Sequence, residues 1–277
     1  MRPLLATALL LSALAHGDEP ADAPQASSTE PVFHGFYFRL GGLFLQPLPS
    51  SQEVRLEGVT GAARLGLSDG PIAGSSVGLG NAAMPALTVG FAPPFLNHQL
   101  SLETILAVPF KLKLYAKGTL ATKSLAPTVL GSLPTGVPAL GEELGETTAL
   151  PPVLTAVYRF LPGWRVNPYV GVGFSVLIAT DARITNPLLT EVSTPKLEIP
   201  PAVGYVLQGG ADVHLYKWFY ATADLKFIGG LDLTARVKNV YVRLPNLPLY
   251  EAVKVGDTVS SVSVNPIVFQ LGVGMNL

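Results

Sequence analysis

The sequence has no cysteine and little charge, and both absences narrow the class of protein. Only 13% of its 277 residues are charged, about half the share of an ordinary soluble domain, whereas 48% are hydrophobic. The missing cysteines exclude a disulfide framework and a lipid anchor attached through cysteine. The formal net charge of −1 gives no indication of a nucleic-acid partner.

A long hydrophobic run is also missing after the N-terminus, where no stretch of about 18 apolar residues could form a membrane helix. A chain this apolar nevertheless indicates contact with lipid. Only helices and closed β-barrels cross a bilayer, because every backbone N–H and C=O must be paired within the protein. The composition therefore predicts a membrane-spanning barrel.

The N-terminal residues 1–15, MRPLLATALLLSALA, have the pattern of a secretory signal peptide. A positive charge at Arg2 precedes an apolar centre, and the small residues Ala13 and Ala15 precede the predicted cleavage point. A short core helix is the alternative interpretation. Residues 16–32 are polar and proline-rich and are predicted to be a disordered lead-in, which leaves 33–277 as the barrel domain.

Eight later segments have strand character, with β-branched and aromatic residues and period-two alternation. Their connections alternate between long ones and the short sequences APPFLN, LPGWR and YKW. This layout is typical of a transmembrane barrel with short periplasmic turns and long extracellular loops, whereas a soluble β-sandwich gives no reason for it. We therefore expect an all-β, eight-stranded antiparallel barrel in the outer membrane of a Gram-negative cell, with both termini periplasmic. The segments are about 35–47, 83–92, 98–110, 149–161, 165–179, 202–215, 218–237 and 260–276.

Alternation assigns one apolar face of each segment to lipid and the other to the lumen. In the third segment, for example, Leu102, Leu106, Val108 and Phe110 are predicted to face lipid. The same alternation directs several charged or polar side chains inward. They could form a selectivity filter, or a salt-bridged plug in the periplasmic half, and the narrow interior of an eight-stranded barrel favours the plug. These residues are Arg39, Glu103, Arg159, Asp212, Asp224, Lys226 and Tyr169.

The first two extracellular loops are apolar, although loops that face water are normally polar. Residues 59–80 and 120–145 are rich in Leu, Val, Ala, Gly and Pro. Such loops either pack on each other or line an apolar entrance to the barrel, and we favour the entrance.

Several motifs follow one another along the chain: GFYFRLGGLFLQPLPSS (35–51), LSLETILAVPFK (100–111), LPPVLTAVYRF (150–160), NPYVGVGF (167–174), YKWFYATADLKFI (216–228) and VSVNPIVFQLGVGMNL (262–277). Together they resemble the OmpW family of eight-stranded outer-membrane barrels. The resemblance implies a narrow apolar channel through which small hydrophobic molecules, such as alkanes in some members, cross the lipopolysaccharide layer and leave sideways because the base is blocked. It also implies that passage follows a gradient without a cofactor.

The chain departs from the family pattern at three places. Leu112 stands where members often have a histidine, and Leu277 stands where the barrel-assembly machinery usually reads a terminal Phe. The first and second outer loops are longer than the family pattern predicts. The partners implied are membrane lipids and lipopolysaccharide, small hydrophobic ligands, and the barrel-assembly machinery during insertion.

An enzyme and a non-conducting barrel are the competing functions. Catalysis needs a nucleophile, a base and an orienting group within reach of one another, and the histidines at 16, 34, 98 and 214 are scattered. No His, Asp and Glu cluster has metal-ligand spacing, so we expect no catalytic site, metal site or cofactor. A structural or recognition barrel that conducts nothing stays open as the alternative, because function depends on sites and not on the fold.

Overall fold

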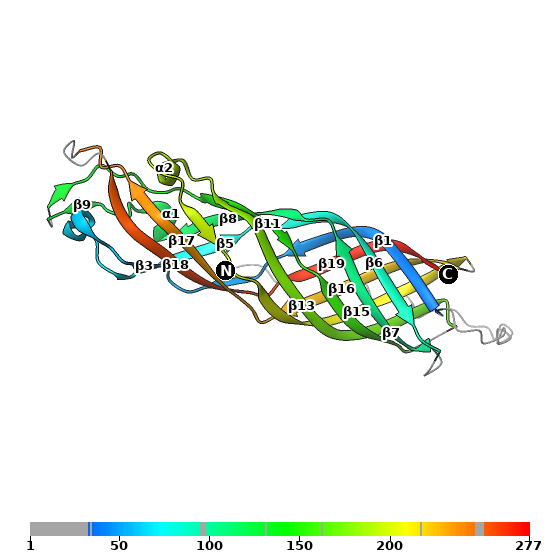
Figure 1. Cartoon of the computed structure of the whole chain (residues 1–277). Coiled ribbons are helices and arrows are strands. Elements are labelled where there is room, and N and C mark those ends of the chain that lie inside the picture. The colour runs from blue at the N-terminus through cyan, green and yellow to red at the C-terminus, as the bar shows by residue number, and fades with distance from the viewer. Residues whose placement is uncertain are drawn as a thin grey trace, which may run out of the picture. The chain divides into compact units, whose positions relative to one another are not determined.

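A closed antiparallel β-barrel forms the membrane-spanning part of the computed structural model (Figure 1). The structure describes residues 33, 35–94, 98–130, 132–161, 163–216, 218–246 and 252–277, so the predicted signal peptide and lead-in lie outside the described residues. Each barrel strand pairs with the next, and β19 closes the ring on β1. In ring order the strands are β1 (Gly35–Gln46), β6 (Ala82–Ala92), β7 (Leu100–Ala107), β12 (Val153–Arg159), β13 (Val166–Ile184), β15 (Ala202–Tyr216), β16 (Phe219–Gly229) and β19 (Ile267–Asn276).

This ring confirms the predicted eight-stranded barrel. The three short connections join β6 to β7, β12 to β13 and β15 to β16, and the C-terminal strand ends beside Trp218 at the same end of the barrel. Among the described residues, no helix is long and apolar enough to cross a membrane.

Two bands of exposed aromatic side chains mark the lipid-facing surface. One band lies near the short turns, where Phe36 and Phe91 are opposite each other. The other lies further along the strands, where Phe44 is opposite Phe269 and Phe174 is opposite Tyr205. Aromatic girdles at both interfaces are typical of outer-membrane barrels. Further members of the first band are Tyr158, Phe160, Trp164, Tyr216 and Trp218.

Beyond the second band, the long connections continue as strands and extend the wall outward, at the left of Figure 1. We name this part the outer extension. It forms because alternation persists in sequences such as FKLKLYAKG, which puts Leu112 and Leu114 inside and lysines outside. Its strands are β2 (Pro49–Ser51), β3 (Arg55–Glu57), β4 (Gly70–Pro71), β5 (Ser75–Leu79), β8 (Phe110–Gly118), β11 (Glu143–Leu150), β14 (Lys196–Glu198), β17 (Leu231–Val242) and β18 (Val253–Val264), with the outer part of β13.

The ranges 111–148, 180–201 and 238–259, which were interpreted as loops, therefore hold much of this extension. The predicted strand 218–237 is in fact two, because the chain turns at Gly230, where φ is 75°. Short elements close the outer end, and apolar side chains from several connections pack there into one core. These elements are the 3-10 helix η1 (Gly61–Leu65), helices α1 (Thr119–Thr122) and α2 (Pro187–Thr190), and the hairpin β9 (Thr128–Val129) with β10 (Leu133–Pro134).

Prolines interrupt the wall at one level between the barrel and the outer extension. The β7–β12 ladder ends where Ile105 is opposite Val153, and the β8–β11 ladder begins where Phe110 is opposite Ala149. The intervening residues include Pro109, Pro151 and Pro152, and proline has no N–H to donate to a ladder. Neither ladder joins 106–109 to 150–152, and we call this place the wall break.

The orientation predicted for Phe110 is wrong, because the wall break interrupts the alternation. Phe110 was expected to face lipid with Leu106 and Val108, which are indeed 56% and 58% exposed. Phe110 is instead buried, because β7 ends at Ala107 and the alternation starts again in β8.

Candidate functional site

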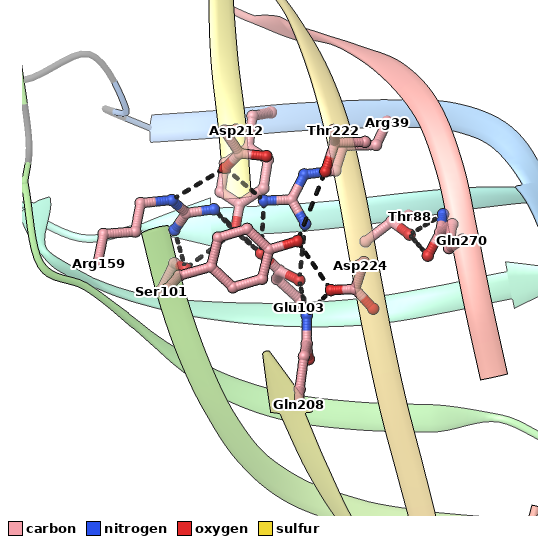
Figure 2. Close-up of polar contacts among 12 residues, drawn as sticks. Arg39, Thr88, Ser101, Glu103, Arg159, Gln208, Asp212, Thr222, Asp224 and Gln270 are labelled. Atoms are coloured by element: carbon pink, nitrogen blue, oxygen red, sulfur yellow. Dashed lines mark hydrogen bonds and ion pairs between the residues drawn. The ribbon is translucent and has the colours of Figure 1, made fainter. Parts of the chain in front are cut away.

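The lumen of the barrel holds a buried charged cluster at the level of the lipid-facing bands. Arg39 on β1 donates to Asp212 on β15 and to Glu103 on β7, and the nitrogen–oxygen distances are 3.0 and 3.1 Å. Arg159 on β12 donates to the same Glu103 at 3.1 Å and to the Ser101 hydroxyl at 2.6 Å. These side chains come from four strands and meet across the lumen, as Figure 2 shows.

A second acidic group joins this cluster through one amide. Gln208 donates to Asp224 at 2.7 Å and to Glu103 at 3.1 Å, and so links the two carboxylates. Asp224 also accepts from the Tyr169 hydroxyl at 2.8 Å and forms an ion pair with Lys226. The structure thus places all seven inward residues named from the sequence in one connected network: Arg39, Glu103, Arg159, Tyr169, Asp212, Asp224 and Lys226.

The six charged members form three cations and three carboxylates, so the cluster has no formal net charge. None of the six is more than 6% exposed. A buried charge is tolerated only when it is paired and hydrogen-bonded, and here each carboxylate has at least one cationic partner. The cluster therefore balances its own formal charges across the lumen, while Arg39 Nε, Gln208 Oε1 and Asp212 Oδ1 have no hydrogen-bond partner among the described residues.

Aromatic rings cover the cluster on the side of the short turns. The Arg159 guanidinium lies 4.0 Å from the ring centroid of Phe33, which itself contacts the rings of Tyr37 and Tyr220. The rings of Tyr37 and Tyr220 fit only because Gly90 and Gly274 leave room, since a Cβ at either glycine would overlap the phenol ring. Reasoning from charge and alternation missed these aromatic and glycine partners. Tyr37, Gly90, Tyr220 and Gly274 have the inward parity of their strands, whereas Phe33 precedes the first strand.

Above the cluster, the outer extension encloses an apolar cavity of about 110 Å³. Its wall is almost wholly aliphatic, and the exceptions are Thr147, Thr258 and Ser260. An apolar cavity of this size stays dry and suits a small hydrocarbon. Side chains from opposite walls, such as Leu114, Leu177, Leu233 and Val262, line it together with apolar residues of the closing connections.

A smaller cavity of about 20 Å³ lies between the apolar cavity and the charged cluster. Ala107, Phe110 and Pro151 line it on the side of the wall break, and Lys226 lines it from β16. In ring order, β16 is four strands from β7, so Lys226 lies across the lumen from the break. The apolar interior therefore narrows downward and ends at the charged cluster.

The wall of the outer extension also has an outward-facing cleft beside β14. Ala179, Leu197 and Ile199 line both this cleft and the apolar cavity. Asp181, Glu198 and Arg236 form part of its polar rim. Among the residues that the structure describes, no group of three or more His, Asp or Glu side chains could hold a metal ion.

Comparison with known proteins gives one family and several similar folds. The model of the OmpW family matches residues 55–277. The crystal structure of OprG from Pseudomonas aeruginosa is similar with a TM-score of 0.65 and 18% identity, over 88% of this chain and 98% of that one. At this identity the likeness shows the fold.

Two other outer-membrane proteins are less similar. AlkL in DMPC bilayers has 16% identity and a TM-score of 0.46, over 94% of this chain and 95% of its own. Protein W of E. coli has 18% identity and a TM-score of 0.44, over 88% of this chain and 98% of its own. No curated protein sequence matches the chain significantly.

Proposed function

The chain belongs to the OmpW family and lies in the outer membrane, and we propose that it is a channel for passive passage of small hydrophobic molecules. The observation that supports this proposal is the apolar cavity enclosed by the outer extension directly above the charged cluster. Transfer of a hydrocarbon from water into such a cavity has a favourable free energy of about 25 cal/mol for each Å² of apolar surface removed from water. No cofactor or energy source is required, because the ligand moves down its gradient.

The outward-facing cleft beside β14 is the entrance in this proposal. Leu197 and Ile199 are shared by the cleft and the cavity, so displacement of their side chains connects the two without unfolding a strand. The entrance is thus apolar where it meets the cavity and polar at its rim.

The exit in this proposal is sideways, through the wall break. The charged cluster closes the direct route because an apolar molecule that entered it would separate paired, buried charges. At the break, the smaller cavity is separated from lipid by a wall with no ladder between 106–109 and 150–152. Leu106 and Val108 face outward at this level, so the medium beyond the break is apolar.

Uptake of radiolabelled n-alkanes of several lengths by cells with and without the full chain tests this function. Glycerol serves as a polar control in the same cells. We expect faster uptake of short alkanes when the protein is present, with no change for glycerol. Equal alkane rates at all lengths would contradict the channel and favour the alternative of a non-conducting structural or recognition barrel.

A further inference from the structure

Cationic side chains form a transverse row on the outer surface of the outer extension. The strand registers put Lys113 opposite Glu146, Glu146 opposite Arg183, Arg183 opposite Lys196, and Lys196 opposite Lys238. We call these five residues, four cations and Glu146, the cationic row. They lie at one level on β8, β11, β13, β14 and β17, so they follow the wall around the barrel.

The row faces outward, because the inward neighbours of its members line the apolar cavity. Leu114, Ile184, Leu197 and Val237 each lie next to a row cation and point inside. The side chains of Arg183 and Lys196 are 61% and 73% exposed. Lys111 and Arg236 add two further exposed cations beside the row, and Glu198 and Asp181 add two carboxylates.

The protein neutralises only part of this charge. Across the row and its flanking residues, six cations face three carboxylates, Glu146, Glu198 and Asp181. Glu146 is 3.4 Å from Lys111 and 3.8 Å from Arg183, and Glu198 is within 3.0 Å of Lys196 and Lys238. In the part of the chain that the structure describes, no ion pair involves Lys113 or Arg236.

The arrangement is costly to the isolated barrel. Arg183, Lys196 and Lys238 are directly opposite one another on adjacent strands, and like charges in this position destabilise a sheet. The row ends at β17, because on the next strand, β18, Asp257 accepts from the Asn239 N–H and lies opposite Glu57. The excess positive charge therefore lies on β8, β13, β14 and β17, where an external anion would offset it.

The level of the row indicates which anion is available. Phe174 belongs to the outer aromatic band, and Arg183 lies further out on the same strand by roughly 20–25 Å along the barrel axis, for a rise of about 3.3 Å per residue and a tilt of about 40°. This level is within the polar layer above the outer leaflet, where the sugars of lipopolysaccharide carry phosphate and carboxylate groups. Neighbouring strands are about 4.8 Å apart, so the row offers several closely spaced charges to one polyanionic headgroup.

We propose that the cationic row docks the phosphate-bearing inner saccharide of lipopolysaccharide. Lys and Arg bind phosphate by charge-assisted hydrogen bonds, and each cation near an anionic membrane surface contributes about 1 kcal/mol. The row borders the cleft beside β14, because Lys196 and Lys238 flank Glu198 on its rim. A docked saccharide thus lies next to the cleft and holds its outer wall in place.

Native mass spectrometry of the full protein in mild detergent tests the proposal, with purified rough-type lipopolysaccharide as the probe. The variant Lys113→Gln/Lys196→Gln removes two row cations, and Arg55→Gln/Lys254→Gln removes two exposed cations elsewhere on the extension. We expect the first variant to bind roughly tenfold to thirtyfold more weakly, from two cations at the value above, and the second to bind as the parent does. Equal affinities for the two variants would overturn the proposal.

Three further measurements separate the proposal from simpler explanations. Lys113→Arg/Lys196→Arg keeps the charge and should keep the affinity, whereas a loss would overturn a charge-based site. Lipopolysaccharide dephosphorylated with hydrofluoric acid should bind more weakly, and unchanged binding would overturn the role of phosphate. Heparin should bind more weakly than lipopolysaccharide; if it binds equally and shows the same loss in the variant, the row is a general anion surface and the proposal fails. None of these measurements depends on alkane uptake.

Discussion

Arg39 on β1 and Asp212 on β15 form an ion pair of 3.0 Å inside the barrel, although 173 residues separate them in the chain. Both side chains are almost completely buried, and the pair shares its surroundings with Glu103 and Arg159. The pair joins distant parts of the wall, so side chains cross the lumen at this level.

Removal of one member should cost more than removal of the pair. We expect Asp212→Asn to lower the free energy of unfolding by about 3–5 kcal/mol, because it leaves two guanidinium groups with too few carboxylates. Arg39→Met/Asp212→Leu should cost less than either single change. Urea titration of the gel mobility shift in lipid vesicles measures both. Lys254→Met, at an exposed position, is the control and should stay within about 0.5 kcal/mol of the parent. A double variant that is less stable than both singles would contradict the pairing.

Gly90 should be intolerant of even one methyl group. The Tyr37 ring lies against it and cannot withdraw, because its hydroxyl donates to Glu103 at 2.6 Å. We expect Gly90→Ala to cost about 1–3 kcal/mol in the same unfolding assay, as overpacking does elsewhere. Gly42→Ala is the matched control in β1, since no atom lies within 4 Å of its added Cβ. Equal stability of the two variants would show that Tyr37 moves freely.

Filling the apolar cavity should block uptake without affecting the barrel. Ser260 lines the cavity with an unpaired hydroxyl, whereas its neighbour Ser261 lies on the other face of β18. We expect Ser260→Phe to reduce alkane uptake toward that of cells without the protein. Ser261→Phe should retain uptake at equal amounts of folded protein in the membrane. Retained uptake in both variants would place the route outside the cavity.

Restoring backbone donors at the wall break should close the sideways exit. Pro109→Thr/Pro151→Thr supplies two N–H groups where the ladder is interrupted, and threonine favours strands. We expect lower alkane uptake together with unchanged or higher resistance to urea. Pro138→Thr, in an exposed connection, is the control and should leave uptake unchanged. Faster uptake in the double variant would argue against an exit at this level.

The pKa of the Glu198 carboxyl reports on the lysines of the cationic row. Hydrogen bonds from Lys238 and Lys196 hold the pKa of its carboxyl below the ordinary value of 4.5. The ion pairs therefore persist at neutral pH and are lost only as the pH falls through that lowered pKa. Carboxyl-carbon NMR of the protein in micelles should show the pKa of Glu198 rising toward 4.5 in Lys196→Gln/Lys238→Gln. An unchanged pKa would mean that solvent, and not the lysines, sets it.

The barrel and its inward charges could be predicted because alternation is a local signal. Arg39, Glu103 and Asp212 each lie on the polar face of a segment whose other face is apolar, and a closed barrel has only one interior. Their pairing could not be predicted, since it depends on the register between strands that are far apart in sequence. The contacts of Phe33 with Arg159 and of Gly90 with Tyr37 depend on that register as well.

The outer extension was missed for a different reason. The segment from Phe110 to Tyr115 alternates as clearly as any barrel strand, but it follows Pro109, and from Lys111 onward it lies in a range assigned to a loop by its length. The same proline reversed the predicted orientation of Phe110. A break in a strand resets alternation, so parity counted from one side of a proline does not apply on the other.

The outer extension would shorten the distance over which an oily molecule has to cross polar surroundings. Its aliphatic interior begins near the level of the outer aromatic band and continues outward beyond it, at a height where everything outside the wall is hydrated. If the proposed route is correct, an oily molecule inside the wall is shielded from water at this height. The height of the protein wall, and not the length of the surrounding saccharides, would then set the thickness of the polar barrier that the molecule has to cross.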